Sequence, residues 1–330
     1  MKQKIFLALL MLTVFLNSCV VKEVINYKAI SVPEEQGMKF VKYTDEYDNV
    51  IGPATGIKPE TGILQWYAAP LIAISPDGKK LAYMGLKNDF YNLYLRNTEG
   101  GKSVIQRTFN RTVMDMCYSP DGKKIAFTSE KNGNNNIYMI NAEEGAAVQQ
   151  IAASSSSELG PTFSSNGKDI YFAKEESGRY YVWSINLETA LQTQHAEGFT
   201  PVLSPDGKFL IVTKNSKDGM DRGEIWKIDL ETGLTSTIYS DPKIGFSSPA
   251  ISPDGKSIVC VAVTENETNQ RKNLDLYKFN MDGTHLQQLT FHPGHDVSPQ
   301  WSPNGQSIYF ISQRGTEKGE WNIWKVDIKQ

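Results

Sequence analysis

A string built around Ser-Pro-Asp-Gly-Lys recurs six times in this chain and constrains the fold more than any other feature. It reads SPDGKKLAY at 75, SPDGKKIAF at 119, SSNGKDIYF at 164, SPDGKFLIV at 204, SPDGKSIVC at 252 and SPNGQSIYF at 302. The intervals between successive copies are 44, 45, 40, 48 and 50 residues. Such periods, with short alternating strands, are typical of β-propellers, in which each repeat forms one blade. The sequence therefore predicts an all-β, six-bladed β-propeller of four-stranded antiparallel blades.

The repeated string is predicted to be the tight turn between the first two strands of each blade. Proline fixes φ at the first corner, Asp or Asn bonds the backbone just beyond, and glycine adopts the positive φ that other residues avoid. We therefore expect a structural turn role, not a catalytic or metal-binding one, for the six Asp or Asn residues, which are Asp77, Asp121, Asn166, Asp206, Asp254 and Asn304.

Prolines indicate which strand is innermost. Pro161, Pro201, Pro249 and Pro299 each stand three residues before a copy of the string. Because proline has no N–H to donate to a ladder, it is confined to edge strands. The first strand of a propeller blade has one free edge, which faces the central channel, so the prolines are expected there.

The last repeat needs a strand from elsewhere in the chain. It ends EWNIWKVDIKQ, at 320–330, which supplies a third strand and nothing for a fourth. Without that strand an edge would stay exposed, which favours aggregation. An N-terminal strand is expected to complete the last blade. Residues 39–46, KFVKYTDE, resemble the LQQLTFH ending of the fifth repeat and are the first choice, and 62–67, GILQWY, are the alternative.

The N-terminus predicts export and lipid anchoring. Lys2 and Lys4 precede the apolar stretch 5–16, which is typical of a signal peptide. The following LNSC resembles the lipobox of bacterial lipoproteins, and this resemblance implies a signal peptide at 1–18 and lipidation of Cys19. A plain signal peptide is the alternative. Residues 19–37 are then the lipidated cysteine and a flexible tether, and 38–330 the propeller. Val20, where an Asp would indicate inner-membrane retention, favours the outer membrane, with the side of that membrane left open.

The charge balance of the chain argues against one class of partner. Lys and Arg number 34 against 37 Asp and Glu, without a basic block, which argues against nucleic-acid binding.

Cys117 and Cys260 lie in apolar, strand-like runs of different repeats and are expected to be buried, unreactive thiols. We expect a monomer, because a closed ring needs no partner to cover its edges.

The repeat P-x-[W/F/I/L]-S-P-D-G-K-x-[I/L] resembles the TolB-like, WD40-like (PD40-type) propeller repeat over most of the chain. This resemblance implies six blades and a scaffold that binds another envelope protein. The chain departs from TolB itself because it carries its own lipid-anchor signal and shows no separate α/β domain before the repeats. Similar repeats occur in oligopeptidase-like enzymes and in oligogalacturonate lyases, so fold alone does not decide the function.

Enzyme motifs are missing from the sequence. It contains no G-x-S-x-G, H-E-x-x-H, G-x-x-x-x-G-K-[ST] or G-x-G-x-x-G, and we expect neither catalytic residues nor a cofactor. The alternative is a carbohydrate-binding or polysaccharide-processing propeller, similar to oligogalacturonate lyase, with a divalent metal bound by His. His292, His295 and Asp296, in FHPGHDV, are the candidate ligands for that metal.

The variable loops are predicted to carry the function. Segments that join the last strand of one blade to the first strand of the next differ in length and chemistry, whereas the Ser-Pro-Asp-Gly turns do not. Scaffolds commonly bind partners through such loops. We expect an envelope-protein partner to contact this face through the candidate residues Trp66, Tyr67, Arg107, Arg111, Asp241 and Lys243.

Overall fold

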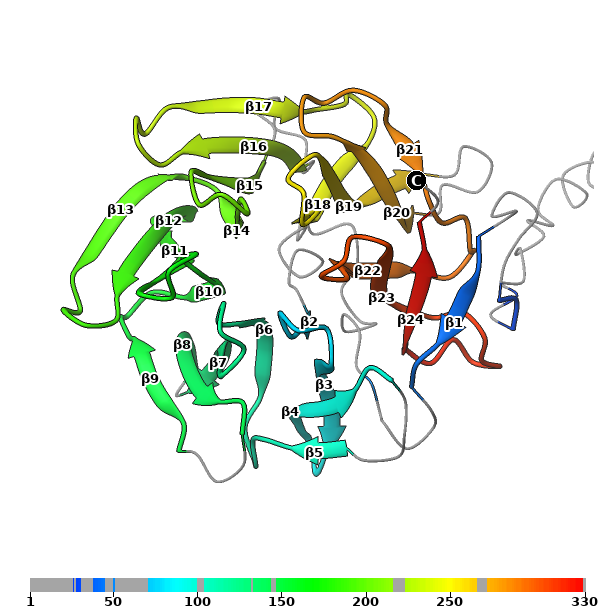
Figure 1. Ribbon diagram of the computed structural model, residues 1–330, viewed down its shortest axis with the longest axis horizontal. Helices are drawn as coiled ribbons and strands as arrows, with labels where there is room; N and C mark the ends of the chain where they lie inside the picture. The colour runs from blue at the N-terminus through cyan, green and yellow to red at the C-terminus, as the bar shows by residue number, and fades with distance from the viewer. Residues whose placement is uncertain are drawn as a thin grey trace, which may run out of the picture.

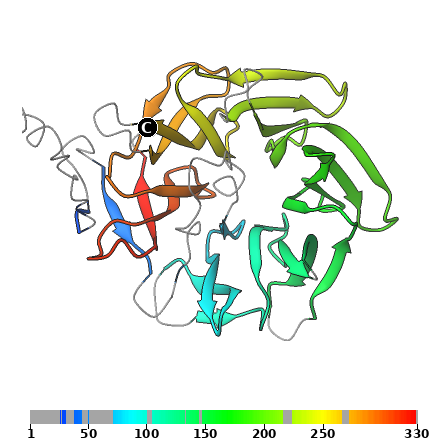
Figure 2. The same cartoon turned by 180° about the vertical axis from the view of Figure 1, so that it is seen from behind.

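The computed structural model describes residues 26, 28–30, 38–44, 50, 71–99, 104–131, 133–143, 147–215, 223–265 and 272–328. These residues form strands and turns, and no helix occurs among them. The strands make six four-stranded antiparallel sheets arranged as blades in a closed ring (Figure 1). The same ring is seen from behind in Figure 2. Within the described part of the chain, no helix is long and apolar enough to cross a membrane.

The first three blades follow the chain in order from the innermost strand outward. Blade 1 contains β2 (Ile72–Ile74), β3 (Lys80–Lys87), β4 (Phe90–Asn97) and β5 (Val104–Gln106). Blade 2 contains β6 (Val113–Tyr118), β7 (Lys124–Lys131), β8 (Asn134–Asn141) and β9 (Gln149–Ala152). Blade 3 contains β10 (Glu158–Phe163), β11 (Asp169–Glu176), β12 (Arg179–Asn186) and β13 (Gln192–Glu197).

The next two blades repeat this order, and the last departs from it. Blade 4 contains β14 (Phe199–Leu203), β15 (Phe209–Asn215), β16 (Gly223–Asp229) and β17 (Thr235–Tyr239). Blade 5 contains β18 (Gly245–Ile251), β19 (Ser257–Glu265), β20 (Lys272–Asn280) and β21 (Gln287–Gln288). Blade 6 contains β22 (Asp296–Trp301), β23 (Ser307–Ser312), β24 (Asn322–Asp327) and, from the other end of the chain, β1 (Phe40–Lys42). The predicted fold class is confirmed.

The N-terminal strand β1 closes the ring as the outermost strand of blade 6. It pairs antiparallel with β24, with Phe40 opposite Val326, and the blue and red strands lie side by side in Figure 1. Thr44 then accepts a hydrogen bond through Oγ1 from the Ile323 N–H at 2.9 Å. Thr108 of blade 1 and Thr290 of blade 5 accept the same bond from their own third strands, also at 2.9 Å. The first choice, KFVKYTDE, is thus confirmed, and the alternative 62–67 lies outside the described residues.

Each Ser-Pro-Asp-Gly turn is held by the same hydrogen bonds. In blade 1, Asp77 Oδ1 accepts from Ser75 Oγ at 2.6 Å and from the Lys79 N–H at 3.0 Å, and Gly78 has φ of 72°. The Ser75 hydroxyl, followed by the Lys79 amide, holds the pKa of Asp77 below its usual value. Corresponding serine-to-Asp or serine-to-Asn bonds of 2.6–2.7 Å occur in the other five blades, and the acceptors are Asp121, Asn166, Asp206, Asp254 and Asn304.

The six turns also contact one another around the ring. A Cβ built on Gly122 would lie 3.5 Å from Cδ of Pro76 in the preceding blade, and one on Gly78 would lie 3.6 Å from Pro303 of blade 6. The remaining neighbours in the ring have the same arrangement, with Ser165 in the place of proline beside Gly207. We call this closed series of contacts the turn ring. It joins blade 6 to blade 1 by the same contact that joins the other blades.

The hydrophobic core lies between the faces of neighbouring blades. The second strands carry its fully buried side chains, for example Leu81, Ile125 and Phe310, each with no exposed area. The third strands place an aromatic residue at one register position in every blade, and these residues are Tyr94, Tyr138, Trp183, Trp226, Tyr277 and Trp324. Burial of these apolar surfaces is the main force that holds the blades together.

Candidate functional site

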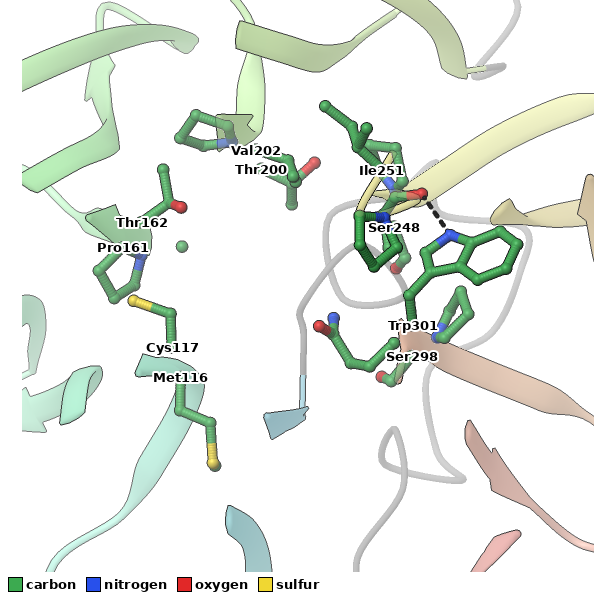
Figure 3. Close-up of a pocket in the computed structure, with 17 residues that line it drawn as sticks. Met116, Cys117, Pro161, Thr162, Thr200, Val202, Ser248, Ile251, Ser298 and Trp301 are labelled. Carbon is green, nitrogen blue, oxygen red and sulfur yellow. Dashed lines mark hydrogen bonds between the residues drawn. The ribbon is translucent and has the colours of Figure 1, made fainter. Parts of the chain in front are cut away.

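A cavity of about 200 Å³ lies at the centre of the ring. Its wall comes from the innermost strands of blades 2 to 6, namely β6, β10, β14, β18 and β22 (Figure 3). The four repeated prolines, Pro161, Pro201, Pro249 and Pro299, all line it. The prediction that these prolines stand on the innermost strands is therefore confirmed, and we call the space the central cavity.

A β-bulge shapes each of these five strands. The register against the second strand shifts in β6, β10, β14, β18 and β22. One residue in each bulge has positive φ, and these residues are Asp115, Gly160, Thr200, Ser248 and Ser298, at 22°, 62°, 49°, 48° and 54°. In blades 3 to 6 the following residue is the proline. The repeated bulge bends each strand and directs its residues toward the central cavity.

The wall of the central cavity carries no charged side chain among the described residues that line it. Its polar groups are hydroxyls, the Cys117 thiol and the Gln300 amide. Trp301 contributes its indole ring, whose Nε1–H donates to the Ala250 carbonyl at 3.2 Å, drawn as the dashed line in Figure 3. Burial raises the pKa of Cys117 to about 12, so this thiol is protonated at neutral pH. The wall is neutral and partly apolar.

A buried carboxylate lies directly before this wall in the sequence. Asp115 is 4% exposed, and its Oδ2 accepts from the Gly160 N–H of blade 3 at 2.9 Å and from Thr128 Oγ1 at 3.2 Å. Its Oδ1 has no hydrogen-bond partner among the described residues. Burial, only partly offset by these bonds, raises the pKa of Asp115 to about 6. It titrates close to physiological pH.

One aromatic side chain stands out on the loop face, where the fourth strand of each blade leads to the first strand of the next. Phe109, between β5 and β6, is 70% exposed. Two residues on, the Arg111 guanidinium lies over the Tyr138 ring of blade 2, 4.6 Å from its centroid. The loop therefore presents an apolar side chain beside a half-buried cation.

The structure places the other predicted contact residues in different surroundings. Arg107 is 7% exposed, and its Nη2 donates to the carbonyls of Asn141, at 2.8 Å, and Glu143 in blade 2. It joins two blades and does not present its guanidinium on the loop face. Asp241 Oδ1 accepts from the N–H groups of Lys243 and Ile244, at 2.7 and 3.0 Å, so it stabilises its own loop, while Lys243 is exposed. Trp66, Tyr67 and Cys19 lie outside the described residues.

The three candidate metal ligands do not form a common ligand set. Asp296 Oδ2 pairs with Arg314 Nη2 at 2.6 Å, and both side chains are fully buried. His292, also fully buried, accepts the Gly294 N–H on Nδ1 at 2.9 Å, and burial lowers its pKa. The His295 ring stacks on Trp321 with centroids 6.5 Å apart. In the part of the chain that the structure describes, no three His, Cys, Asp or Glu residues are grouped to hold a metal.

Arg314 fixes the N-terminal segment to blade 6. Its Nη1 donates to the Ile30 carbonyl at 3.0 Å, its Nε to Ser312 Oγ at 3.0 Å, and its Cζ lies 4.2 Å from the centroid of the Phe40 ring. Nothing in the sequence distinguished Arg314 from a surface arginine. Asp115 could have been noticed by aligning the repeats, because Gly, Thr or Ser stands at its position in blades 3 to 6.

Comparisons with known proteins agree with this architecture. The family model described as the TolB beta propeller domain, PD40, matches residues 61–240 and 219–330. Among curated proteins, dipeptidyl-peptidase 5 of Porphyromonas gingivalis is 28% identical over 134 residues, which cover 38% of this chain and only 19% of that protein.

Solved structures show the same fold at low sequence identity. A putative TolB from Agrobacterium tumefaciens has a TM-score of 0.59 at 20% identity, covering 80% of this chain and 90% of that one. TolB from Acinetobacter baumannii has a TM-score of 0.61 at 22% identity, covering 77% and 64%. Oligogalacturonate lyase from Vibrio parahaemolyticus has a TM-score of 0.55 at 15% identity, covering 80% and 90%.

Proposed function

The chain belongs to the TolB β-propeller family, and from this premise we propose that it is a non-enzymatic envelope lipoprotein whose loop face binds another envelope protein. Its anchor would be Cys19 in the outer membrane. The observation that carries the proposal is Phe109, which keeps 70% of its surface exposed on the loop face beside Arg111. Aromatic and arginine side chains are enriched at the energetic centres of protein interfaces.

Two further observations support binding in preference to catalysis. The residues that line the central cavity include no charged or histidine side chain, so they offer no general acid, general base or metal ligand of those types. Two of the candidate contact residues, the half-buried Arg111 and the exposed Lys243, are cations on loops. A partner with acidic and apolar groups would complement Phe109, Arg111 and Lys243.

The test is crosslinking and recovery of the lipidated protein from its own cell envelope. The variant Phe109→Ser with Arg111→Ala is compared with Leu234→Ser, because Leu234 is 72% exposed on the opposite, turn-bearing face. The proposal expects a protein that is recovered with wild type and with Leu234→Ser, and lost with the loop-face variant. Equal recovery with all three proteins would contradict the assignment of the loop face.

One contact favours carbohydrate binding as a second candidate function. His295 and Trp321 stack at an interplanar angle of 20° on half-buried positions of blade 6. The indole ring of Trp321, at a partly exposed position, offers a large, flat apolar surface for a sugar ring. Trp321→Ala should then abolish retention on a polysaccharide affinity column, whereas Phe109→Ser should not.

A further inference from the structure

The chemistry of the central cavity indicates which group it accepts. We propose that it receives a hydrogen-bond donor without negative charge, a lysine ammonium or a free amino terminus of the bound protein, and excludes carboxylates and other anions. This inference rests on the proposed function, because it specifies the group that the partner inserts. It is distinct from the Phe109 contact on the loop face.

Anions meet no cationic side chain among the described residues of the wall. None of the described residues that line the cavity is Lys, Arg or His. Pro161, Pro201, Pro249 and Pro299 have no N–H, so four of the five innermost strands lose a backbone donor at this level. The hydroxyl and amide donors of the wall carry no positive charge, and transfer of an ionised carboxylate from water to a site without a paired cation is strongly unfavourable. A carboxylate would therefore be rejected.

A hydrogen-bond donor that enters the central cavity meets several acceptors. Each wall proline keeps its carbonyl oxygen, and the hydroxyls of Thr162 and Ser248 can also accept. Asp115 immediately precedes Met116 and Cys117 of the wall, and its Oδ1 has no partner among the described residues. A carboxylate this close attracts positive charge, and more so at low dielectric.

Trp301 adds a second attraction for cations. Its indole ring lines the cavity, while its N–H is directed at the Ala250 carbonyl (Figure 3). The ring is thus among the groups that line the cavity, and aromatic rings attract ammonium and guanidinium groups through their faces.

The native thiol Cys117 allows a direct test. Its side chain lies in the cavity wall, whereas Cys260 has no exposed area. The full chain with Cys19→Ser is treated with aminoethyl, methyl or sulfonatoethyl methanethiosulfonate, which are cationic, neutral and anionic. Each rate is divided by the rate with free cysteine, and Cys117→Ser controls for reaction elsewhere. The proposal expects the cationic reagent to react at least about tenfold faster than the anionic one after this correction. Asp115→Asn should reduce that ratio.

Equal corrected rates, or a faster anionic reagent, would overturn the proposal. If Cys117 reacts with none of the three reagents, Gln300→Cys provides a second thiol in the wall, and failure there as well would show that the cavity is closed to solutes and overturn it too. The reaction rates of the thiol are measured in the absence of a partner protein, so their outcome is independent of the recovery experiment. If the thiol reaction is selective for the cationic reagent but no protein is recovered by crosslinking, the proposal for the cavity is supported and the proposed function is contradicted.

Discussion

Asp115 in blade 2 accepts a hydrogen bond from the backbone N–H of Gly160 in blade 3, at 2.9 Å. Ser298 in blade 6 makes the corresponding contact with blade 1, where its Oγ accepts from the Leu71 N–H at 3.4 Å. Both acceptors are bulge residues with positive φ, and both donors belong to the next blade. Two of the bulges therefore connect neighbouring blades in addition to shaping the central cavity.

Asp115 should make stability depend on pH. Its pKa of about 6 in the folded protein lies above the unfolded value of about 4. The folded state thus binds the proton more tightly, so this contribution is complete below about pH 4 and is lost as the pH rises through 6. Its size is about 2–3 kcal/mol. The free energy of urea unfolding is measured from pH 4 to 8 for wild type and for Asp115→Asn. The difference between the two proteins should show this loss.

The exposed turn residue Asp121 provides a control with the opposite sign. Bonds from Ser119 and from the Lys123 N–H lower its pKa. Its contribution should therefore be present at neutral pH and lost as the pH falls through the folded pKa. If Asp115→Asn and Asp121→Asn change the pH profile in the same direction, the assignment for Asp115 is wrong.

Arg314→Met should be strongly destabilising. It leaves Asp296 buried without its cation, which typically costs about 3–5 kcal/mol, and it removes the bond to the Ile30 carbonyl. Arg314→Met combined with Asp296→Asn should recover part of that loss. Chemical denaturation of the single and double variants measures the coupling. Additive effects would show that the pair does not interact energetically.

Thr44→Val should weaken closure of the ring. It keeps the shape of the side chain but leaves the Ile323 N–H buried without its acceptor, at a cost of about 1–3 kcal/mol. Thr284→Val, in an exposed turn of blade 5, is the matched control and should change the free energy of unfolding much less. Thermal unfolding followed by circular dichroism compares the two.

Alanine substitutions at two glycines of blade 4 distinguish the cost of backbone strain from the cost of altering a contact between turns. Gly207 and Gly233 both have φ of +71°, but an added Cβ would lie 2.8 Å from Ser165 Oγ at Gly207 and would meet nothing within 4 Å at Gly233. Both alanine variants should lose about 1 kcal/mol through strain. Gly207→Ala should lose more, and Ser165→Ala should restore that excess. Equal losses in urea denaturation would show that the turn ring contributes nothing there.

The blades were predictable because their signals are local. The turn string, the alternation of the third strand and the prolines each depend on a few adjacent residues. The closing strand was also predictable, since Thr44 stands in the same short context as Thr290 and makes the same hydrogen bond. Such features repeat in sequence because the physical requirement repeats in every blade.

The surroundings of individual polar residues were not predictable in this way. Arg107 was expected on the surface, but its long side chain reaches the carbonyls of Asn141 and Glu143, and only the packing of blade 1 on blade 2 brings these within reach. The pairing of Asp296 with Arg314 likewise depends on how a loop folds back over its own blade. Unlike the contacts of the turn ring, these contacts each occur once and so have no periodic signature in a single sequence.

The turn ring has a consequence for how the chain could be reordered. Pro303 meets Gly78 as Pro76 meets Gly122, so the junction of blade 6 with blade 1 has the same proline–glycine contact as junctions inside the chain. At the outer edge of blade 6, by contrast, the N-terminal strand β1 pairs with β24. A circular permutant that begins at blade 2 and rejoins the original ends would keep every contact of the turn ring. The contacts of the turn ring therefore do not depend on the order of the blades along the chain.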